Sequence, residues 1–326
     1  MICLGIESTA HTFGASVVQN TTVLSNQKHA LTNEDGGMIP ALLAEHHVQY
    51  AKVIITQALK KAKMSIQDVN CIAISQSPGI GNALRIGMLC AKTLAVLHNK
   101  PLVGVNHCIA HLEIGRLLTQ AKDPILLYAS GANTQIISYE QQRYRILGET
   151  LDNGIGNMLD MFARHIGLGF PGGPKIAELA QKSTNYIPLP YVVKGMDVSF
   201  GGILTNIKQK YDSKQYDVHD ICFSLQETVF AMLTEVTERA LAHCNKNEVV
   251  LGGGVACNTR LQQMVTAMCA QRNATCYCLP NEYNVDNAAM IALTGLLMYK
   301  AQNTLSIAQA QIEPYVRTDD VIVNWR

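Results

Sequence analysis

Two histidines four residues apart, His107 and His111, are the side chains of this chain best suited to chemistry. On a helix this spacing places both imidazoles on one face, one turn apart. Neutral imidazole is the commonest protein ligand of transition metals, and a pair at this spacing is a recurring half of a zinc site. The spacing alone leaves a second interpretation open, namely two polar residues on a half-exposed helix.

Asp286 is the candidate third ligand, because it stands among small residues, directly before Asn287, Ala288 and Ala289. A carboxylate oxygen suits zinc or iron beside two imidazoles, and two histidines with one carboxylate leave positions open for a substrate. The alternative is that Asp286 caps the apolar helix that we expect to open there, and both roles are compatible.

Three turns have the composition of phosphate-binding loops: residues 7–10, 130–134 and 252–258. Glycine lets the backbone approach an anion, serine, threonine and asparagine add donors, and a following helix adds a favourable dipole. Each turn alone could be an ordinary tight turn, but three together favour a nucleotide in a cleft. No G-x-G-x-x-G follows a predicted strand to open a Rossmann unit, and no P-loop motif occurs, which disfavours a dehydrogenase or a P-loop enzyme.

Carboxylates flank a glycine- and proline-rich elbow at residues 167–174: Asp152, Asp160 and Glu178. An acidic residue in such a place can accept hydrogen bonds from ribose hydroxyls. Each of them is also compatible with a solvated helix position or a helix cap.

Size and composition predict a two-lobed protein. The chain has 326 residues, of which 48% are hydrophobic and 16% charged, so it folds, and it exceeds the usual limit of a single core. A net charge of +1 argues against a free-standing nucleic-acid binder, so any RNA contact needs a local patch or partner subunits. The ten cysteines form no C-x-x-C pair, which indicates a reducing compartment. Because no apolar run has membrane-spanning length and an apolar run begins at residue 2, we expect no membrane partner, no targeting peptide and a location in the cytoplasm, with the nucleus as a second site.

The order of apolar segments predicts an α/β architecture with a ligand in the cleft between two lobes. We expect a strand meander at residues 2–6, 13–18 and 22–25, helices at 41–63 and 83–97, and strands at 69–75 and 101–105. The second lobe repeats this order, with strands at 125–129, 135–139 and 248–251 and helices at 158–166, 175–181, 220–244 and 259–271. We place the lobes at residues 1–124 and 125–326, with the C-terminal tail free to pack back on the first lobe.

The residues match one family along essentially the whole chain. The landmarks, in order, are GIESTAHTFG, KPLVGVNHCIAHLEIGRL, LLYASGANTQ, GETLDNGIGNMLDMFAR, LPYVVKGMDVSF, GGGVACNTRLQ and DNAAMIA. With them the chain resembles the universal tRNA threonylcarbamoyltransferases, which are TsaD in bacteria and the OSGEP-like catalytic KEOPS subunit in archaea and eukaryotes. The KGMDVSF segment and Tyr128 are similar to the archaeal and eukaryotic cytosolic branch.

The resemblance implies an actin-like ATPase fold, of the sugar-kinase and Hsp70 type, and one divalent metal ion per subunit, iron or zinc. It implies that His107, His111 and Asp286 are catalytic and hold the metal together with Tyr128. It also implies a set of contacts to an adenylate substrate: Tyr128, Ala129, Ser130, Gly131, Ala132, Asn133, Asp160, Gly173, Glu178 and Asn258, with Thr134 alongside.

The chain departs from the family pattern at four places. Ala132 replaces a glycine, so a methyl group stands where backbone usually meets the ligand. Ala177 replaces a carboxylate, so the ribose contact is lost or passes to Glu178. Residues 199–202 read SFGG in place of SFSG, and residues 77–79 read SPG in place of GPG. None of these changes touches the expected metal ligands, and we interpret them as divergence within a working enzyme.

The activity implied is metal-dependent transfer of the threonylcarbamoyl group from threonylcarbamoyl-AMP to the 6-amino group of the adenosine 3′ of the anticodon, position 37, in tRNAs that read codons beginning with A. The implied partners are tRNA and the KEOPS-type small atypical kinase and dimerising subunits. No general base stands out, since His46 and His47 have the sequence context of surface residues. A nucleotide-binding scaffold without catalysis is the first alternative. A metalloprotease is less favoured, because Cys108 stands where H-E-x-x-H needs its glutamate.

Overall fold

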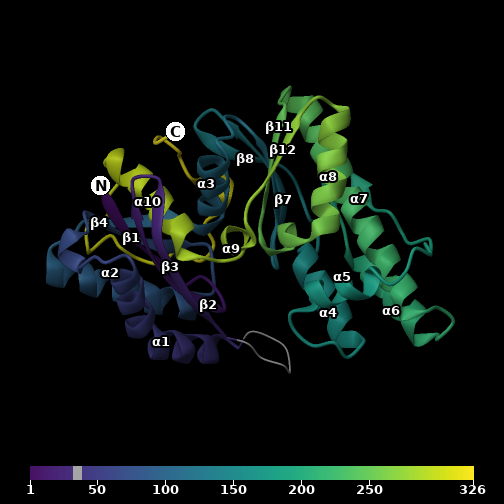
Figure 1. Ribbon diagram of the computed structural model, residues 1–326, viewed down its shortest axis with the longest axis horizontal. Coiled ribbons are helices and arrows are strands. Elements are labelled where there is room, and N and C mark those ends of the chain that lie inside the picture. Colours follow the sequence, from purple (N-terminus) through teal and green to yellow (C-terminus); the bar gives the residue numbers. More distant parts are fainter. Residues whose placement is uncertain (32–38) are drawn as a thin grey trace.

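The computed structural model describes residues 1–31 and 39–326, and its first lobe is built on a five-stranded sheet (Figure 1). Strands β1 (Ile2–Glu7), β2 (Thr12–Gln19) and β3 (Thr22–Ala30) form an antiparallel meander. Strand β4 (Cys71–Ser77) pairs in parallel with β1, and β5 (Leu102–Asn106) pairs in parallel with β4. The strand order β3-β2-β1-β4-β5 brings the carboxyl ends of β1, β4 and β5 to one edge.

The second sheet repeats this topology in the order β12-β11-β6-β7-β8. Its antiparallel meander is β6 (Ile125–Ala129), β7 (Thr134–Glu140) and β8 (Arg143–Glu149). Strand β11 (Glu248–Gly252) pairs in parallel with β6, and β12 (Thr275–Cys278) with β11. A two-stranded ribbon of β9 (Val193–Lys194) and β10 (Asp197–Val198) lies against the end of β8, where the backbone of Leu151 donates to the carbonyl of Val198 at 2.8 Å.

Helices cover both faces of the first sheet, so its central strands read as continuous apolar runs. Helices α1 (Pro40–Lys61) and α2 (Gly81–His98) share a core with Leu4 and Ile6. The opposite face, which includes Cys3, packs against α3 (His107–Thr119) and α10 (Ala288–Lys300). The turn η1 (Ile66–Asp68) links α1 to β4.

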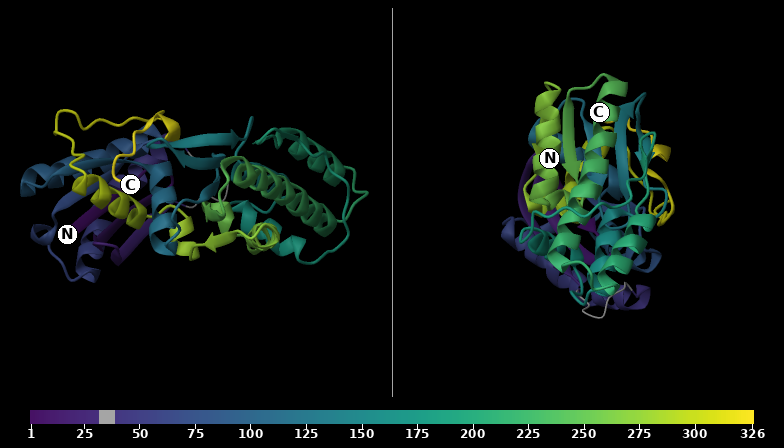
Figure 2. Two further views of the ribbon diagram at one scale, coloured as in Figure 1. Left: turned by 90° about the horizontal axis from the view of Figure 1, so that it is seen from above. Right: turned by 90° about the vertical axis from the view of Figure 1, so that its right-hand side faces the viewer.

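Glycines allow α10 to lie directly on the first sheet. A Cβ on Gly5 of β1 would stand 2.5 Å from the backbone nitrogen of Ala292, and one on Gly295 would stand 2.3 Å from Cβ of Ala73. The helix is apolar all round, as expected of a helix buried between a sheet and other helices. A segment that follows the second lobe in sequence therefore lies in the core of the first, and Figure 2 shows this C-terminal part beside the N-terminal strands.

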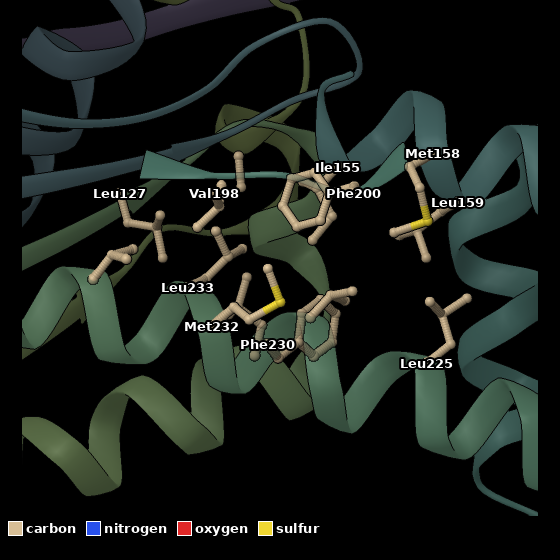
Figure 3. Packing of buried hydrophobic residues seen from close by; sticks show 14 of the residues in the cluster. Leu127, Ile155, Met158, Leu159, Val198, Phe200, Leu225, Phe230, Met232 and Leu233 are labelled. Carbon is tan, nitrogen blue, oxygen red and sulfur yellow. The ribbon is translucent and has the colours of Figure 1, made fainter. Parts of the chain in front are cut away.

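The core of the second lobe lies between its sheet and a layer of helices (Figure 3). Leu127 of the sheet faces Leu233 of the long helix α7 (Val218–Cys244), and Phe200, from the loop before α6 (Gly201–Asp212), lies opposite Phe230 of the same helix. The remaining helices are α4 (Ile155–His165), α5 (Gly172–Ala180), α8 (Thr259–Gln271) and α9 (Asn281–Asn284), with 3-10 turns η2 (Gly254–Cys257) and η3 (Thr318–Asp320).

The predicted meanders and long helices are confirmed, with differences at the ends of elements. The last helix begins at Ala288, two residues after the predicted start, because Asn287 is its cap. Helix α5 begins inside the predicted elbow, at Gly172. Strands β8 and β12 and helix α6 were not predicted, although Ile203, Leu204 and Ile207 of α6 follow helical spacing. The lobe limits 1–124 and 125–326 stay a prediction. Across the described ranges, no helix combines the length and apolarity that a membrane crossing requires.

Candidate metal and nucleotide site

The histidine pair lies at the start of α3, at the carboxyl end of β5. Asn106 ends the strand and caps the helix, accepting a hydrogen bond from the backbone of Ile109 at 3.1 Å. His107 is the first helical residue, and its ring centroid lies 4.8 Å from that of His111. Both histidines are buried, so the helix presents two imidazoles on one inward face.

Asp286 joins the pair from the loop between α9 and α10. Its Oδ1 lies 3.5 Å from Nε2 of His107 and 3.4 Å from Nε2 of His111, and the three potential ligand atoms lie within 4.8 Å of one another. Asn287, and not Asp286, caps α10, because its side chain accepts the hydrogen bond from the backbone of Met290. The carboxylate of Asp286 is therefore available to the two histidines, and a His-His-Asp site is present.

Glu7 contacts His107 on the side of the ring opposite Asp286. Its Oε2 lies 3.1 Å from Nδ1 of His107, and its Oε1 accepts hydrogen bonds from the backbone and the hydroxyl of Thr9. A carboxylate only accepts, so it keeps a proton on Nδ1 of His107 and turns Nε2 toward Asp286, where this nitrogen donates to the carboxylate or, once deprotonated, can bind a cation. The sequence analysis assigned residues 7–10 to a phosphate loop and missed this role of Glu7.

Charge in this site is governed by burial and by the neighbouring carboxylates. Burial opposes ionisation, yet Glu7 and Asp286 together raise the pKa of His107 well above its usual value. Burial likewise opposes the charge of Asp286, but hydrogen bonds from the two imidazoles lower its pKa well below the usual value. Burial lowers the pKa of His111. The site therefore holds an ionised carboxylate against two imidazoles, a donor set that suits a borderline divalent cation.

Tyr128 lies next to the pair at the end of β6. Its ring is 5.3 Å from the ring of His111, and only 1% of the residue is exposed. Burial raises the pKa of its phenol well above the usual value, so a phenolate there needs a nearby positive charge. Nδ1 of His111 is buried without a hydrogen-bond partner among the described residues.

Two of the three predicted phosphate loops offer free backbone donors. In the turn after β6, no described residue accepts a hydrogen bond from the backbone N–H of Gly131 or Ala132, and the same holds for Gly253 and Gly254 after β11. A Cβ on Gly253, which has φ +92°, would lie 2.4 Å from the carbonyl oxygen of Ala129, so these turns touch. Together they form a cradle for an anion. Ala132 is exposed, so the structure accommodates its methyl group without burying it.

The first predicted loop has its donors occupied. The N–H of Ser8 donates to the hydroxyl of Ser75 at 3.0 Å, and the N–H of Thr9 donates to Glu7 at 2.8 Å. This turn therefore supports the histidine pair and offers neither of these two donors to a phosphate.

A cavity of about 210 Å³ lies beyond the cradle, between α5, α7 and α8. Asn258, a predicted contact, lines it and also caps α8. Ala177 lines it as well, whereas Glu178 does not and instead forms an exposed ion pair with Lys182 at 3.7 Å. A ribose contact from Glu178 is thus not part of this arrangement.

The other acidic candidates serve as helix caps. Oδ1 of Asp160 accepts a hydrogen bond from the backbone of Gly172 at the start of α5, next to Gly173, and burial raises its pKa. Asp152 accepts hydrogen bonds from Ser199 and from the backbone of Phe200 and Gly201 at the start of α6. Burial disfavours the charged form of Asp152, yet these hydrogen bonds stabilise that form and lower the pKa of the carboxyl group to about 2.

The expectation that His46 and His47 are surface residues is wrong. Helix α1 packs its inner face on the first sheet, which buries both histidines and sets His47 against Phe13. His29, His46 and His47 form a chain of imidazoles, with nitrogen–nitrogen distances of 2.7 Å and 3.1 Å. Burial and His46 lower the pKa of His47 to about 4.

Sequence comparisons match one family throughout. The family described as tRNA N6-adenosine threonylcarbamoyltransferase matches residues 21–293. The chain is 52% identical to a protein of that name from Thermococcus sibiricus and 51% identical to one from Thermococcus kodakarensis, covering all of both proteins. It is 49% identical to a protein from Methanosarcina mazei called a probable bifunctional tRNA threonylcarbamoyladenosine biosynthesis protein, and spans 59% of that longer chain.

Solved structures share the fold at low identity. HypF from Thermococcus kodakarensis matches 92% of this chain with 48% of its own, at a TM-score of 0.64 and 13% identity. Component A of an Acidaminococcus fermentans (R)-2-hydroxyglutaryl-CoA dehydratase matches 92% of this chain with 98% of its own, at a TM-score of 0.57 and 16% identity. These neighbours confirm the predicted two-lobed, actin-like α/β fold.

Proposed function

The chain belongs to the tRNA N6-adenosine threonylcarbamoyltransferase family, and we propose that it transfers the threonylcarbamoyl group of threonylcarbamoyl-AMP to the 6-amino group of adenosine 37 in tRNAs that read codons beginning with A. The observation that carries the proposal is one juxtaposition. A His-His-Asp cluster lies directly beside a turn with free backbone donors, since Asn133 of that turn approaches Cys108 of α3 to 3.8 Å. The cavity at the end of the second turn, residues 252–258, is the place for the nucleoside.

His107, His111 and Asp286 are the residues that would hold a divalent cation, iron or zinc, with the phenol oxygen of Tyr128 alongside. Three features fit this role: nitrogen and oxygen ligand atoms within 4.8 Å of one another, the Glu7 carboxylate on the far side of His107, and a buried unpartnered nitrogen on His111. Such an ion supplies Lewis acidity and a template that orients the threonylcarbamoyl group.

The chain's own residues then act by positioning. The 6-amino group of adenine is conjugated with the ring and is a weak nucleophile, so it needs an activated acyl group held at attack distance. The amine nitrogen forms a bond to the carbamoyl carbon, the bond from that carbon to the phosphate oxygen breaks, and the amine proton passes to solvent. Backbone N–H groups of Gly131, Ala132, Gly253 and Gly254 stabilise the charge that develops on the departing AMP phosphate.

The protein works, in this proposal, with tRNA and with KEOPS-type partners, a small atypical kinase subunit and a dimerising subunit, in the cytoplasm, with the nucleus as a second location. Two features support partners. The net charge of +1 gives only a weak electrostatic attraction for RNA. Relatives called probable bifunctional contain a similar sequence within longer chains.

The test is mass spectrometry of nucleosides from unmodified tRNA after incubation with the protein, threonylcarbamoyl-AMP and partners, with and without a chelator. We expect threonylcarbamoyladenosine only with metal present, and none with His111→Ala. His243→Ala, at an exposed histidine of α7, is the matched control and should retain activity. Full modification by His111→Ala would favour the scaffold alternative. Elemental analysis after anaerobic purification distinguishes iron from zinc.

A further inference from the structure

The nucleoside cavity contains one buried polar side chain whose hydrogen-bonding direction is determined by the fold. Gln226 of α7 is only 7% exposed and lines the cavity. The nearest carboxylate on the lining, Glu227, is engaged by Arg260 through two hydrogen bonds of 2.7 and 2.6 Å. Gln226 is therefore the buried group that remains for a ligand.

The start of α8 fixes the orientation of the Asn258 side-chain amide. Oδ1 of Asn258 accepts hydrogen bonds from the backbone N–H groups of Arg260 at 2.9 Å and Leu261 at 3.4 Å. A helix N-terminus offers only donors, so the atom that faces it must be the amide oxygen. The other end of the Asn258 amide is thus the NH2 group.

Asn258 in turn fixes the orientation of the Gln226 side-chain amide. Nδ2 of Asn258 donates to Oε1 of Gln226 at 3.0 Å. Because a donor faces it, this atom of Gln226 must be the oxygen, and the amide cannot turn without setting two donors against each other. Nε2 of Gln226 donates to no described residue. This nitrogen is not enclosed by protein atoms, so it is accessible from the cavity that Gln226 lines.

We propose that Gln226 reads the base of the adenylate, donating a hydrogen bond from Nε2 to a ring nitrogen of adenine. This rests on the proposed function, because the AMP part of the substrate is what fills the cavity. The turn that offers free N–H groups at Gly253 and Gly254 ends at Asn258, so the cavity adjoins the phosphate cradle. A ribose hydroxyl both donates and accepts and needs no fixed partner, whereas an unprotonated ring nitrogen only accepts and requires a fixed donor.

The test measures the Kd of AMP and of its 1-deaza, 3-deaza and 7-deaza analogues by calorimetry, with wild-type protein and Gln226→Met. We expect one analogue to bind wild-type protein about five- to ten-fold more weakly than AMP, the loss of one hydrogen bond. Gln226→Met should bind AMP equally weakly and should no longer distinguish that analogue from AMP. Gln209→Met, at an exposed glutamine of α6, should behave as wild type.

Asn258→Asp tests the determined direction itself. Aspartate keeps the cap of α8 but sets a carboxylate oxygen against Oε1 of Gln226, so the amide turns its NH2 group away from the cavity, and the variant should no longer distinguish that analogue from AMP. Circular dichroism verifies that each variant folds.

Three results would overturn the proposal. The first is wild-type AMP affinity in Gln226→Met. The second is weaker binding in Gln226→Met while wild type binds all three analogues as well as AMP, which would indicate a ribose contact. The third is no AMP binding by wild type. Selective AMP binding without transfer to tRNA would contradict the proposed function and leave the reading of the base intact.

Discussion

The replacement Glu7→Gln isolates the contribution of the carboxylate behind His107. Glutamine has the same shape, so its Oε1 keeps the hydrogen bonds from Thr9, while an NH2 group replaces the oxygen that lies 3.1 Å from Nδ1 of His107. Two donors then meet, and the imidazole relieves the conflict by moving its proton to Nε2. That nitrogen faces Asp286 at 3.5 Å and would lose the lone pair that a cation needs.

The expected loss of metal affinity follows from other proteins in which a carboxylate holds a metal-binding histidine. Removing such a carboxylate typically costs 10- to 100-fold in metal affinity, or about 1.4 to 2.7 kcal/mol at 25 °C. We therefore expect the Kd for Zn²⁺ or Co²⁺, measured by competition with a chromophoric chelator, to rise by about one to two orders of magnitude in Glu7→Gln.

Glu113→Gln is the matched control. Glu113 is equally buried on α3, but its carboxylate binds the hydroxyl of Tyr144 at 2.6 Å and the side chain of Arg116. Its replacement should lower stability and leave the metal Kd unchanged. Wild-type metal affinity in Glu7→Gln, or an equal loss in both variants, would refute the reasoning.

Three further outcomes concern the elements that hold the site. Asn287→Ala removes the cap of α10 and should lower the free energy of unfolding in urea by about 1–2 kcal/mol; an unchanged midpoint and slope would contradict this. Gly5→Ala places a methyl group 2.5 Å from the backbone of Ala292 and should cost about 1–3 kcal/mol or prevent folding, whereas Gly202→Ala in α6, with nothing within 4 Å, should not lower the thermal midpoint, because alanine favours a helix over glycine. His47 has a pKa of about 4 in the folded chain against an ordinary value of 6.5, so the unfolded chain binds more protons between these values. Its contribution to stability should be complete above about pH 6.5 and fall as the pH drops toward 4, and chemical unfolding of His47→Gln at several pH values should show a shallower dependence.

Most strands and helices of this fold can be predicted from short stretches of the chain. Alternating and continuous apolar runs identify the strands that end at Glu7 and Ala129, and helical spacing identifies α7 and α8, because each signal needs only residues close in sequence. The missed strand β12 has four residues in an edge position, two of them exposed, so burial imposes no pattern on it.

The proposed metal ligands could be predicted by residue type and spacing only in part. His107 and His111 share one helix face by the geometry of the helix alone. Asp286 lies 175 positions after His111, and Glu7 lies 100 positions before His107, so no local pattern relates them. The roles of Asn287 as the cap and Asp286 as the partner of the histidines follow from the way α10 lies on the first sheet.

The proposed nucleotide contacts could likewise be predicted only in part. Composition singled out three glycine-rich turns, but which backbone donors are free depends on partners from elsewhere, such as Ser75 for Ser8. The exposed position of Glu178 and the inward position of Gln226 depend on how α5 and α7 pack, which periodicity does not resolve.

The sequence by itself determined the α/β class, the repeated order of elements, the family and the histidine pair, because these depend on neighbours along the chain and on motifs in order. Only the tertiary structure decided which carboxylate faces the imidazoles, which turns keep their N–H groups free and which way an amide points. Those features arise where segments that are 32 to 175 positions apart meet, and burial there forces each polar atom to find a particular partner.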